Sequence, residues 1–499
     1  MKQIVFIILL LLMPFLGFSQ EENLNKKTPK VGLVLSGGGA KGLAHIGVLK
    51  VVDSLGVKID YVAGTSMGAI IGALYASGYS GKDIDSIFKD VDFDKIINDD
   101  LPRASKTFYE RENSEKYALT LPFEHFKIKL PSAISRGQNM HSLLSKLTLH
   151  VGDIDDFNKL PIPFFCVATN VETGEPVYLE SGSLPLAITA SGAFPSLFQP
   201  VNIGNQLLID GGVVNNYPID ELKAKGMDVI IGVDVQDDLA TRENLKSAPE
   251  ILLQINNYRT FNDMKQKAKK TDIYIKPDIT DYTVISFDDG REIISNGEIA
   301  AYKKLDALKL LVSGKNETSA QREKIQPIDS IKINKIFISG NNKYTRSYVI
   351  GKLKFKQDQK IKYNQYVDGV NNLSATNNFE SVINQLKPSE SHEGFDVFMT
   401  LKESSITTFF KFGLHYDGLY KSAALINLTK KQLLFKNDVL SFDFIIGDNV
   451  RYNFDYYIDK GFYWSIGLKS SYNQFEKVIP ATSLLTDEEL ELINVNKLD

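Results

Sequence analysis

Cysteine, histidine and excess positive charge are all scarce in this 499-residue sequence, and each shortage excludes a class of function. The single cysteine, Cys166, excludes an intramolecular disulfide, and its apolar neighbours predict a buried side chain. No group of cysteines and histidines has the spacing of a metal site, so we expect neither a metal nor another cofactor. Because 57 Lys and Arg stand against 61 Asp and Glu, the net charge of −4 argues against nucleic acid as a partner.

Long apolar runs are equally scarce, and the one clear run lies at the N-terminus. Residues 1–19 contain one lysine, an apolar stretch over 4–16, and small residues at Gly17 and Ser19. The stretch is too short to span a bilayer and is typical of a secretory signal peptide, so we expect the mature chain to be exported. No cysteine follows the predicted cut, which argues against a lipid-anchored lipoprotein.

The first of two glycine-bracketed turns runs from Ser36 to Gly42. It follows the short apolar run 31–35, which predicts a buried parallel strand, and it precedes a helical pattern that starts at Leu43. Its four glycines can take positive φ and direct several backbone N–H groups into one concave spot at a helix N-terminus. We therefore expect this loop to bind negative charge.

The second turn reads Gly64-Thr65-Ser66-Met67-Gly68 and joins a predicted strand, 59–63, to a helical run, 69–74. This is the G-x-S-x-G nucleophile elbow, whose flanking glycines, Gly64 and Gly68, permit a tight turn that exposes a serine hydroxyl. The first loop alone also fits the dinucleotide fingerprint G-x-G-x-x-G. A dinucleotide site needs an acid at the carboxyl end of the second strand, whereas Asp60 stands at its start, so the second turn favours a serine nucleophile. The alternative that the glycines serve only close packing of helix and sheet stays open.

A serine nucleophile needs a base, and the sequence offers three candidates. The usual order of Ser, then Asp or Glu, then His is hard to build, because only His392 and His415 among the six histidines come late. Asp210 ends an apolar strand at a glycine turn, beyond the carboxyl end of a strand, where α/β sheets build their sites. His45 is a rival base, although a histidine on a helix that packs on a sheet usually has a structural role. Asp234 also ends a predicted strand, and an ordinary turn is the stronger interpretation for it.

The chain resembles the patatin-like phospholipases in four motifs, which read GGGAKG (37–42), GTSMG (64–68), ASGAFP (190–195) and DGG (210–212). The resemblance implies a three-layer α/β/α domain with a Ser-Asp dyad that needs no histidine. Carried over residue by residue, it implies Ser66 as the nucleophile and Asp210 as the base. It also implies that the substrate is a membrane phospholipid or another acyl-ester lipid.

The same resemblance gives the first glycine loop a role. It implies that the backbone amides of Gly37, Gly38 and Gly39 form an oxyanion hole. The family often has arginine where this chain has Lys41, so the loop keeps a cation but not the bidentate geometry of arginine. No metal is required by this scheme.

The predicted hydrolase domain covers residues 29–312, after an N-terminal linker at 20–28. Short β-branched strands alternate there with helical patterns, which is typical of an α/β sheet. The predicted strands are 31–35, 59–63, 163–168, 206–209, 228–235 and 272–276. Residues 99–135 fit neither rhythm, and a β excursion is a better interpretation for them than a flap over the site.

A linker rich in Ser, Gly, Lys, Glu and Gln follows at 313–330. Residues 331–403 then read as strand, helix, helix, short strand and strand, with the phrase IFISGN at 336–341. This order resembles a POTRA domain, the periplasmic module that precedes outer-membrane barrels. An unrelated small α+β domain is the alternative.

From 404 to 474 five segments alternate apolar or aromatic residues with polar ones. Segments of about nine to eleven residues suit tilted strands across a bilayer. We therefore predict part of an outer-membrane β-barrel over 404–499, with a soluble β-sandwich edge as the alternative. A membrane barrel needs at least about eight strands, so we expect the barrel to continue beyond this sequence, after an acidic helical pattern at 484–492.

Together these features predict a secreted serine acyl hydrolase tethered through a POTRA-like domain to the outer membrane. Its hydrolase domain would lie in the periplasm or on the cell surface, and a homodimer is among the assemblies considered. The competing hypothesis is an outer-membrane transport or assembly protein whose first domain only binds lipid or a partner. An intact pair of Ser66 and Asp210 argues against that hypothesis, because a binding module needs neither.

Overall fold

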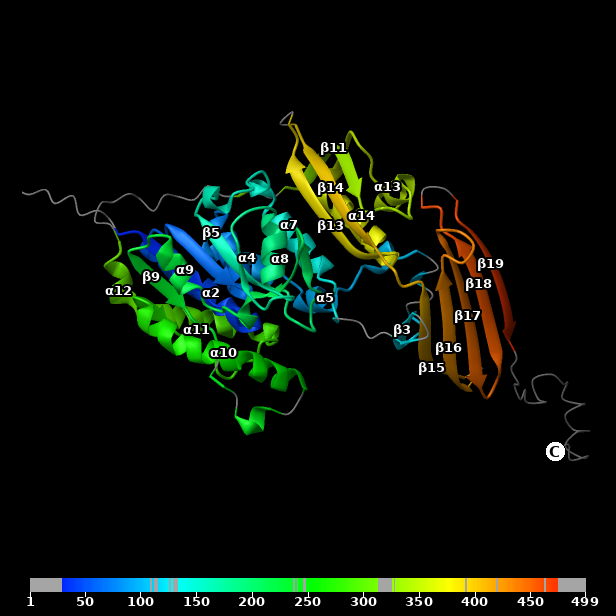
Figure 1. Ribbon diagram of the computed structural model, residues 1–499, viewed down its shortest axis with the longest axis horizontal. Coiled ribbons are helices and arrows are strands. Elements are labelled where there is room, and N and C mark those ends of the chain that lie inside the picture. Colours follow the sequence, from blue (N-terminus) through cyan, green and yellow to red (C-terminus); the bar gives the residue numbers. More distant parts are fainter. Residues whose placement is uncertain are drawn as a thin grey trace, which may run out of the picture.

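The structure is a computed structural model that describes residues 29–473 with short gaps. The gaps are 108–109, 112–114, 125–126, 129–132, 237, 240, 246–247, 313–324, 327, 391–392, 419–420 and 462–463. The predicted signal peptide, the 20–28 linker, most of the 313–330 linker and the 484–492 helix lie outside the described residues. Figure 1 shows three bodies in a row, namely an α/β domain, a small α+β domain and a C-terminal sheet.

The α/β domain is built on an eight-stranded sheet in the order β10-β9-β1-β2-β5-β8-β7, with β6 also paired to β5. Its strands are β1 (Val31–Leu35), β2 (Tyr61–Thr65), β5 (Phe164–Asn170), β6 (Pro176–Leu179), β7 (Val201–Ile203), β8 (Gln206–Asp210), β9 (Val229–Val233) and β10 (Ile273–Ile275). The five strands from β10 to β5 are parallel, and β8 returns antiparallel to β5. The predicted α/β sheet is confirmed, and β6 and β7 are strands that the sequence pattern did not predict.

One predicted strand lies two residues away from its observed position. The predicted 59–63 is observed as Tyr61–Thr65, and just before it the carboxylate of Asp60 accepts the Val31 N–H (2.9 Å). The strand consequently runs up to the residue before Ser66. This places the serine directly at the end of β2.

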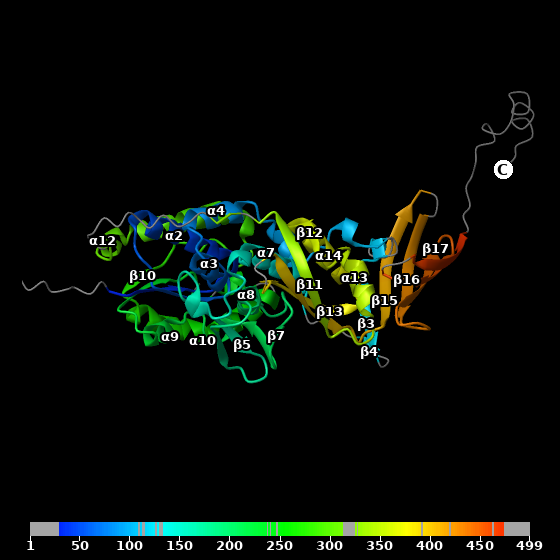
Figure 2. The ribbon, with the colours of Figure 1, turned by 90° about the horizontal axis from the view of Figure 1, so that it is seen from above.

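Two buried clusters on opposite faces of the sheet give the domain its three layers. Along β1, Leu33 and Leu35 face one cluster while Val34 faces the other, as the two-residue period of a strand requires. The helices are α2 (Ala44–Leu55), α3 (Met67–Ala76), α4 (Gly81–Lys89), α5 (Phe93–Asn98), α7 (Gln138–Leu147), α8 (Leu184–Ser191), α9 (Ile219–Ala224), α10 (Ala248–Lys270), α11 (Gly290–Tyr302) and α12 (Leu305–Lys309). Figure 2 shows α2 and α4 on one side of the sheet and α9 and α10 on the other.

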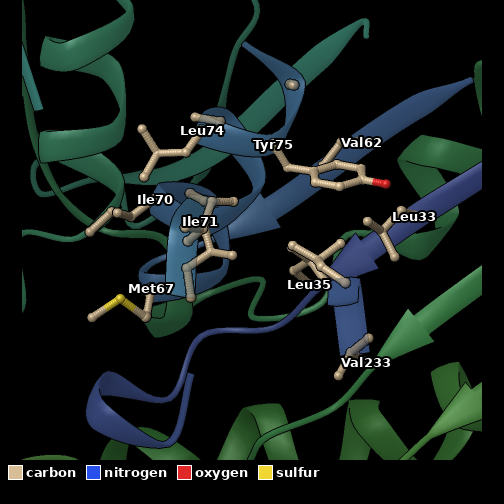
Figure 3. Packing of buried hydrophobic residues seen from close by; sticks show 14 of the residues in the cluster. Leu33, Leu35, Val62, Met67, Ile70, Ile71, Leu74, Tyr75 and Val233 are labelled. Carbon is tan, nitrogen blue, oxygen red and sulfur yellow. The ribbon is translucent and has the colours of Figure 1, made fainter. Parts of the chain in front are cut away.

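Helix α3 is apolar on every side, which is why it is buried against the sheet. All ten of its residues are buried, and Figure 3 shows Ile71 and Tyr75 on the side of the helix that faces Leu35 and Val62 of the sheet. Full burial fixes the N-terminus of this helix, so the elbow before it has little freedom to move.

The α+β domain has the sheet order β12-β11-β14-β13 with two helices. Its elements are β11 (Ser330–Ser339), α13 (Arg346–Leu353), β12 (Gln359–Lys362), α14 (Tyr363–Ala375), β13 (Phe379–Pro388) and β14 (Phe395–Glu403). The predicted order of elements is confirmed, but the strand expected to be short, β13, has ten residues, and β12 was not predicted. The POTRA assignment stays a prediction.

The C-terminal sheet contains the five strands that the alternation predicted. They are β15 (Thr408–Asp417), β16 (Lys421–Lys431), β17 (Asp438–Gly447), β18 (Arg451–Ile458) and β19 (Ile466–Asn473), all antiparallel. The sheet has seven strands, because β3 (Leu119–Glu124) and β4 (Lys127–Ile128) from the 99–135 excursion extend it beyond β15. Residues 99–135 thus contain β-strands, as expected, but these strands belong to the C-terminal sheet and not to the sheet of the α/β domain. Among the helices that the structure describes, none has the length and apolarity needed to cross a bilayer.

Candidate active site

Ser66 occupies the strained turn that the sequence predicts for a nucleophile elbow. It follows β2, precedes α3, and has φ 55° and ψ −125°, a conformation that costs a non-glycine residue about 1–3 kcal/mol. The side chain is partly exposed although its neighbours on both sides are buried. The turn therefore presents the hydroxyl outward at the sheet edge.

Gly64 and Gly68 make the elbow tight enough to form. A Cβ on Gly64 would lie 2.5 Å from the carbonyl oxygen of Gly68, and a Cβ on Gly68 would lie 2.3 Å from that of Leu35. Real Cβ atoms do not approach backbone oxygens this closely. The two glycines thus let α3 start directly against β1, as predicted for the elbow.

Asp210 reaches the serine from an antiparallel strand. In β8 it pairs with Ala168 of β5, so it lies level with the end of β2, and its Oδ2 accepts the Ser66 hydroxyl proton at 2.6 Å. Its other oxygen accepts the N–H of Gly212 at 2.7 Å. Burial raises the pKa of Asp210 to about 6, against the two hydrogen bonds that lower it. The carboxylate is therefore a much stronger base than an exposed aspartate.

Two polar residues that sequence reasoning missed hold this pair in place. The Ser191 hydroxyl accepts the backbone N–H of Ser66 at 3.0 Å and donates to the carbonyl of Val167 at 2.5 Å. The Thr169 hydroxyl donates to the carbonyl of Asp210 at 2.8 Å. Ser191 lies in the ASGAFP motif, so the motif was visible in the sequence, but its role was not.

The first glycine loop lies against the elbow, and one of its amides is already engaged. The N–H of Gly37 donates to the side-chain oxygen of Asn216 at 3.1 Å, so Gly37 does not offer a free donor to an oxyanion. In the part of the chain that the structure describes, the N–H groups of Gly38 and Gly39 have no protein acceptor. Of the three glycine amides predicted for the oxyanion hole, those of Gly38 and Gly39 are therefore the two still available. Asn216, which binds the Gly37 amide, was not identified from the sequence.

Gly39 and Lys41 show how the loop keeps its shape. Gly39 has φ +56°, and a Cβ there would lie 2.3 Å from the carbonyl oxygen of Val284. The backbone N–H of Lys41 donates to the carbonyl of Gly38 at 3.2 Å, and its side chain is buried. The Lys41 amide is therefore used inside the loop and is not an open donor.

The other two candidate bases, His45 and Asp234, form their hydrogen bonds away from the Ser66 hydroxyl. His45 is fully buried, and its Nε2 donates to the carbonyl of Ser36 at 2.8 Å. Burial lowers the pKa of His45 to about 4, so the ring is neutral at neutral pH. Asp234 accepts the Tyr274 hydroxyl at 2.6 Å and the Lys276 ammonium at 2.9 Å. Neither residue is the hydrogen-bond partner of the Ser66 hydroxyl.

No group of three or more metal-ligating side chains occurs among the residues that the structure describes. At the elbow the Ser66 hydroxyl donates to the buried carboxylate of Asp210, and the glycine loop that contacts Ser66 through Gly37 carries two amides with no acceptor among the described residues. Such an arrangement can attack an acyl carbonyl and hold the oxyanion that results.

Comparison with known families agrees with this geometry. Residues 33–223 match the model of the patatin-like phospholipase family, and residues 395–499 match that of the OMP85 superfamily. This chain carries a patatin-like phospholipase domain followed by an OMP85 segment. The patatin match contains both Ser66 and Asp210, and the OMP85 match begins at β14, inside the α+β domain.

Two curated relatives that match about half of this chain are lysophospholipases. Lysophospholipase nte1 of Aspergillus fumigatus is 33% identical over 205 residues, which cover 41% of this chain and 12% of the relative. Lysophospholipase NTE1 of Saccharomyces cerevisiae is 28% identical over 295 residues, or 54% of this chain and 16% of the relative. The chain thus spans less than a fifth of the length of these relatives.

Two solved structures show weaker similarity to parts of this chain. VipD from Legionella pneumophila is 17% identical with a TM-score of 0.34, covering 56% of this chain and 67% of that one. BamA from Haemophilus ducreyi is 16% identical with a TM-score of 0.23, covering 29% of this chain and 28% of that one.

Proposed function

We propose that the chain is a serine acyl hydrolase that cleaves ester bonds of phospholipids or related lipids. The observation that carries this proposal is the 2.6 Å hydrogen bond from the Ser66 hydroxyl to a buried carboxylate, with no histidine in between. The patatin-like domain and the lysophospholipase relatives support a lipid ester as the substrate.

In the proposed mechanism Ser66 and Asp210 act in two steps. As Oγ of Ser66 attacks the ester carbonyl carbon, Asp210 accepts the hydroxyl proton, and the amides of Gly38 and Gly39 donate to the oxyanion. Collapse of the tetrahedral intermediate expels the alcohol, which takes the proton back from Asp210. Water then attacks the acyl-serine while Asp210 accepts its proton, and collapse of this second intermediate releases the fatty acid as Oγ of Ser66 takes the proton back from Asp210.

The pKa of Asp210 matters for this mechanism because a carboxylate is a weak base for a hydroxyl. A base with a pKa of about 6 is ionised at neutral pH and still binds a proton about a hundredfold more tightly than one near 3.8. The fixed amide donors of the oxyanion hole supply further stabilisation of the transition state. Turnover should nevertheless be modest.

The test is fatty-acid release from phospholipid and lysophospholipid vesicles by the purified chain and by Ser66→Ala. Ser77→Ala is the matched control, because Ser77 caps the other end of α3 and its hydroxyl donates to the carbonyl of Ala73 (2.7 Å). We expect Ser66→Ala to lose hydrolysis with an unchanged circular dichroism spectrum, and Ser77→Ala to keep it. Equal rates of fatty-acid release by all three proteins would refute the assignment of Ser66 as the nucleophile.

A second function is favoured by the OMP85 match alone. In that case the chain is an outer-membrane transport or assembly protein, and the patatin-like domain binds lipid without cleaving it. The match supports an outer-membrane location in either case, with the patatin-like domain in the periplasm or on the cell surface. Lipid binding by wild type without any fatty-acid release would favour this second function.

A further inference from the structure

Strand β3 belongs to the patatin-like domain in sequence but to the C-terminal sheet in space. The chain leaves the domain after α5, which ends at Asn98, and returns at α7, which begins at Gln138. Between them, Leu119–Glu124 runs antiparallel to β15, and Figure 1 shows the two strands side by side. The Ala118 N–H adds a bond of 2.9 Å to the carbonyl of Phe412.

The register of β3 continues the alternation of apolar and polar side chains on the two faces of the sheet. On one face, a row of directly paired residues crosses six strands and reads Leu119, Phe412, Ile426, Phe444, Tyr452 and Tyr472. On the other face, the neighbouring row reads Thr120, Lys411, Asn427, Asp443, Asn453 and Ser471. The first row is entirely apolar or aromatic and the second entirely polar, so β3 continues the two-faced pattern without a break.

The polar face is covered by the segment just before β3. The Tyr117 hydroxyl donates to the carboxylate of Asp443, and the Lys116 ammonium lies 3.8 Å from the same group, which is 2% exposed. A Cβ on Gly413 would lie 2.7 Å from the carbonyl oxygen of Lys116, so a glycine is needed where the segment crosses β15. Asn427 and Asp443 in the middle of the polar row are thus buried within the protein, whereas Thr120 and Ser471 at its two ends are exposed.

The apolar face is not covered by any described part of the chain. Every member of the apolar row is more than a third exposed, from 37% at Tyr452 to 50% at Leu119. Ile128 of β4, which pairs with Phe123, is 54% exposed and extends the same face. An exposed apolar face of this width needs an apolar partner in water.

We infer that β3 and β4 are part of the membrane-facing wall, so that membrane lipid covers Leu119, Leu121, Phe123 and Ile128. The argument is continuity: their apolar face extends that of β15 to β19, which belong to the OMP85 segment. An apolar exterior over a polar interior is the pattern of a wall between lipid and a wet lumen. The patatin-like domain is then held at the membrane by its own hairpin, independently of the 313–330 linker.

The inference is tested with a fluorescent label on single cysteines in the full chain, reconstituted in phosphatidylcholine vesicles. The native Cys166 is buried and unreactive, so the unchanged chain measures background labelling. Leu119→Cys tests the apolar face, Thr120→Cys is the matched control one residue away, and Phe412→Cys is the reference. Quenching by nitroxide-bearing lipid is compared with quenching by iodide in the water.

We expect nitroxide lipid to quench the labels at 119 and 412 to a similar extent, and to quench the label at 120 several-fold less. A label at 119 that only iodide quenches would overturn the inference. Cross-links between chains through Leu119→Cys would also overturn it, because a second copy would then cover the face. Leu121→Cys with Phe410→Cys tests the pairing itself, and failure to form that disulfide under oxidant would equally refute the inference.

Discussion

The backbone N–H of Ser66 and the hydroxyl of Ser191 lie 3.0 Å apart, and this hydrogen bond ties the elbow to the end of α8. Ser191 is fully buried, so Ser191→Ala would leave the Ser66 N–H without its acceptor, at a cost of about 1–3 kcal/mol. We predict that kcat falls by roughly 10- to 100-fold with little change in KM, because the nucleophile is misplaced while the lipid site is intact. Steady-state kinetics on a soluble ester measure this, with Ser77→Ala as control. An effect on KM alone would show that Ser191 contacts substrate.

Asp210→Asn should make the protein inactive and more stable at once. The folded-state pKa of about 6 lies above the unfolded value of 3.8, so burial of the charged form costs roughly 3 kcal/mol above pH 6. Asparagine removes that cost and can still bond to Ser66. We predict a loss of about 10²- to 10⁴-fold in kcat together with a higher thermal midpoint at pH 7.5.

The control for this change is Asp234→Asn. That acid is equally buried but is paired with Lys276, so losing its charge should lower the thermal midpoint and leave the dyad in place. A lower midpoint for Asp210→Asn would contradict the interpretation of Asp210 as a strained base.

The activity should have an acidic limb set by Asp210 alone. The carboxylate must be ionised to accept the Ser66 proton, so kcat/KM should rise with pH, pass half-maximum near pH 6 and then level off. The free energy of unfolding should fall as pH rises from 3.8 to about 6, because the folded state binds the Asp210 proton more tightly than the unfolded state does. Rates on a soluble ester from about pH 4 to 9 give the profile. A half-maximum close to pH 4 would show that Asp210 is not desolvated.

His45 should prove structural. Its ring donates to the Ser36 carbonyl and stays neutral, so His45→Gln keeps a donor of similar reach and should retain hydrolysis within about threefold. The pKa of His45 is lower in the folded state than the usual 6.5, so protonation favours unfolding as pH falls from 6.5 toward 4. His45→Gln should therefore also lose some acid sensitivity of the thermal midpoint. Abolished turnover with an intact fold would make His45 the base.

Local patterns in the sequence were enough to predict the elbow, because the glycines at 64 and 68 and the strand-helix rhythm around them specify the turn within a few residues. The same patterns gave Asp210 only as one of three candidate bases, and the family resemblance selected it. The direction of β8 could not be predicted, because a strand pairs with whichever neighbour buries it best. For the same reason Asn216, which lies 179 residues from Gly37 in sequence, was not recognised.

The sequence did not reveal which sheet residues 99–135 belong to. Leu119, Leu121 and Phe123 alternate with polar residues and Pro122, which indicates an edge strand but says nothing about its sheet. The partner, β15, lies almost 300 residues later, and no local signal connects the two. The domain boundaries drawn from composition therefore assign the hairpin to the first domain, whereas its contacts belong to the last.

The pairing of β3 with β15 changes what truncation should do. The sequence alone predicts that a chain of residues 20–403 is soluble, since no apolar run of about 20 residues follows the predicted signal peptide. In the structure the same truncation removes β15, so β3 keeps only its short partner β4 and has one unpaired edge, with Leu119, Leu121 and Phe123 on one face. An unpaired apolar edge promotes association between chains.

We therefore predict that residues 20–403 sediment as aggregates or with membranes, whereas the same truncated chain with Leu119, Leu121 and Phe123 all changed to Thr stays in solution. Threonine keeps strand propensity, so the change removes apolar surface with little effect on the backbone. Sedimentation and light scattering of the two proteins compare them, and three Thr substitutions at exposed sites of α10, Ile251, Ile255 and Tyr258, control for a general gain in solubility. A soluble, monomeric unchanged truncation would show that the hairpin folds back on its own domain once β15 is gone.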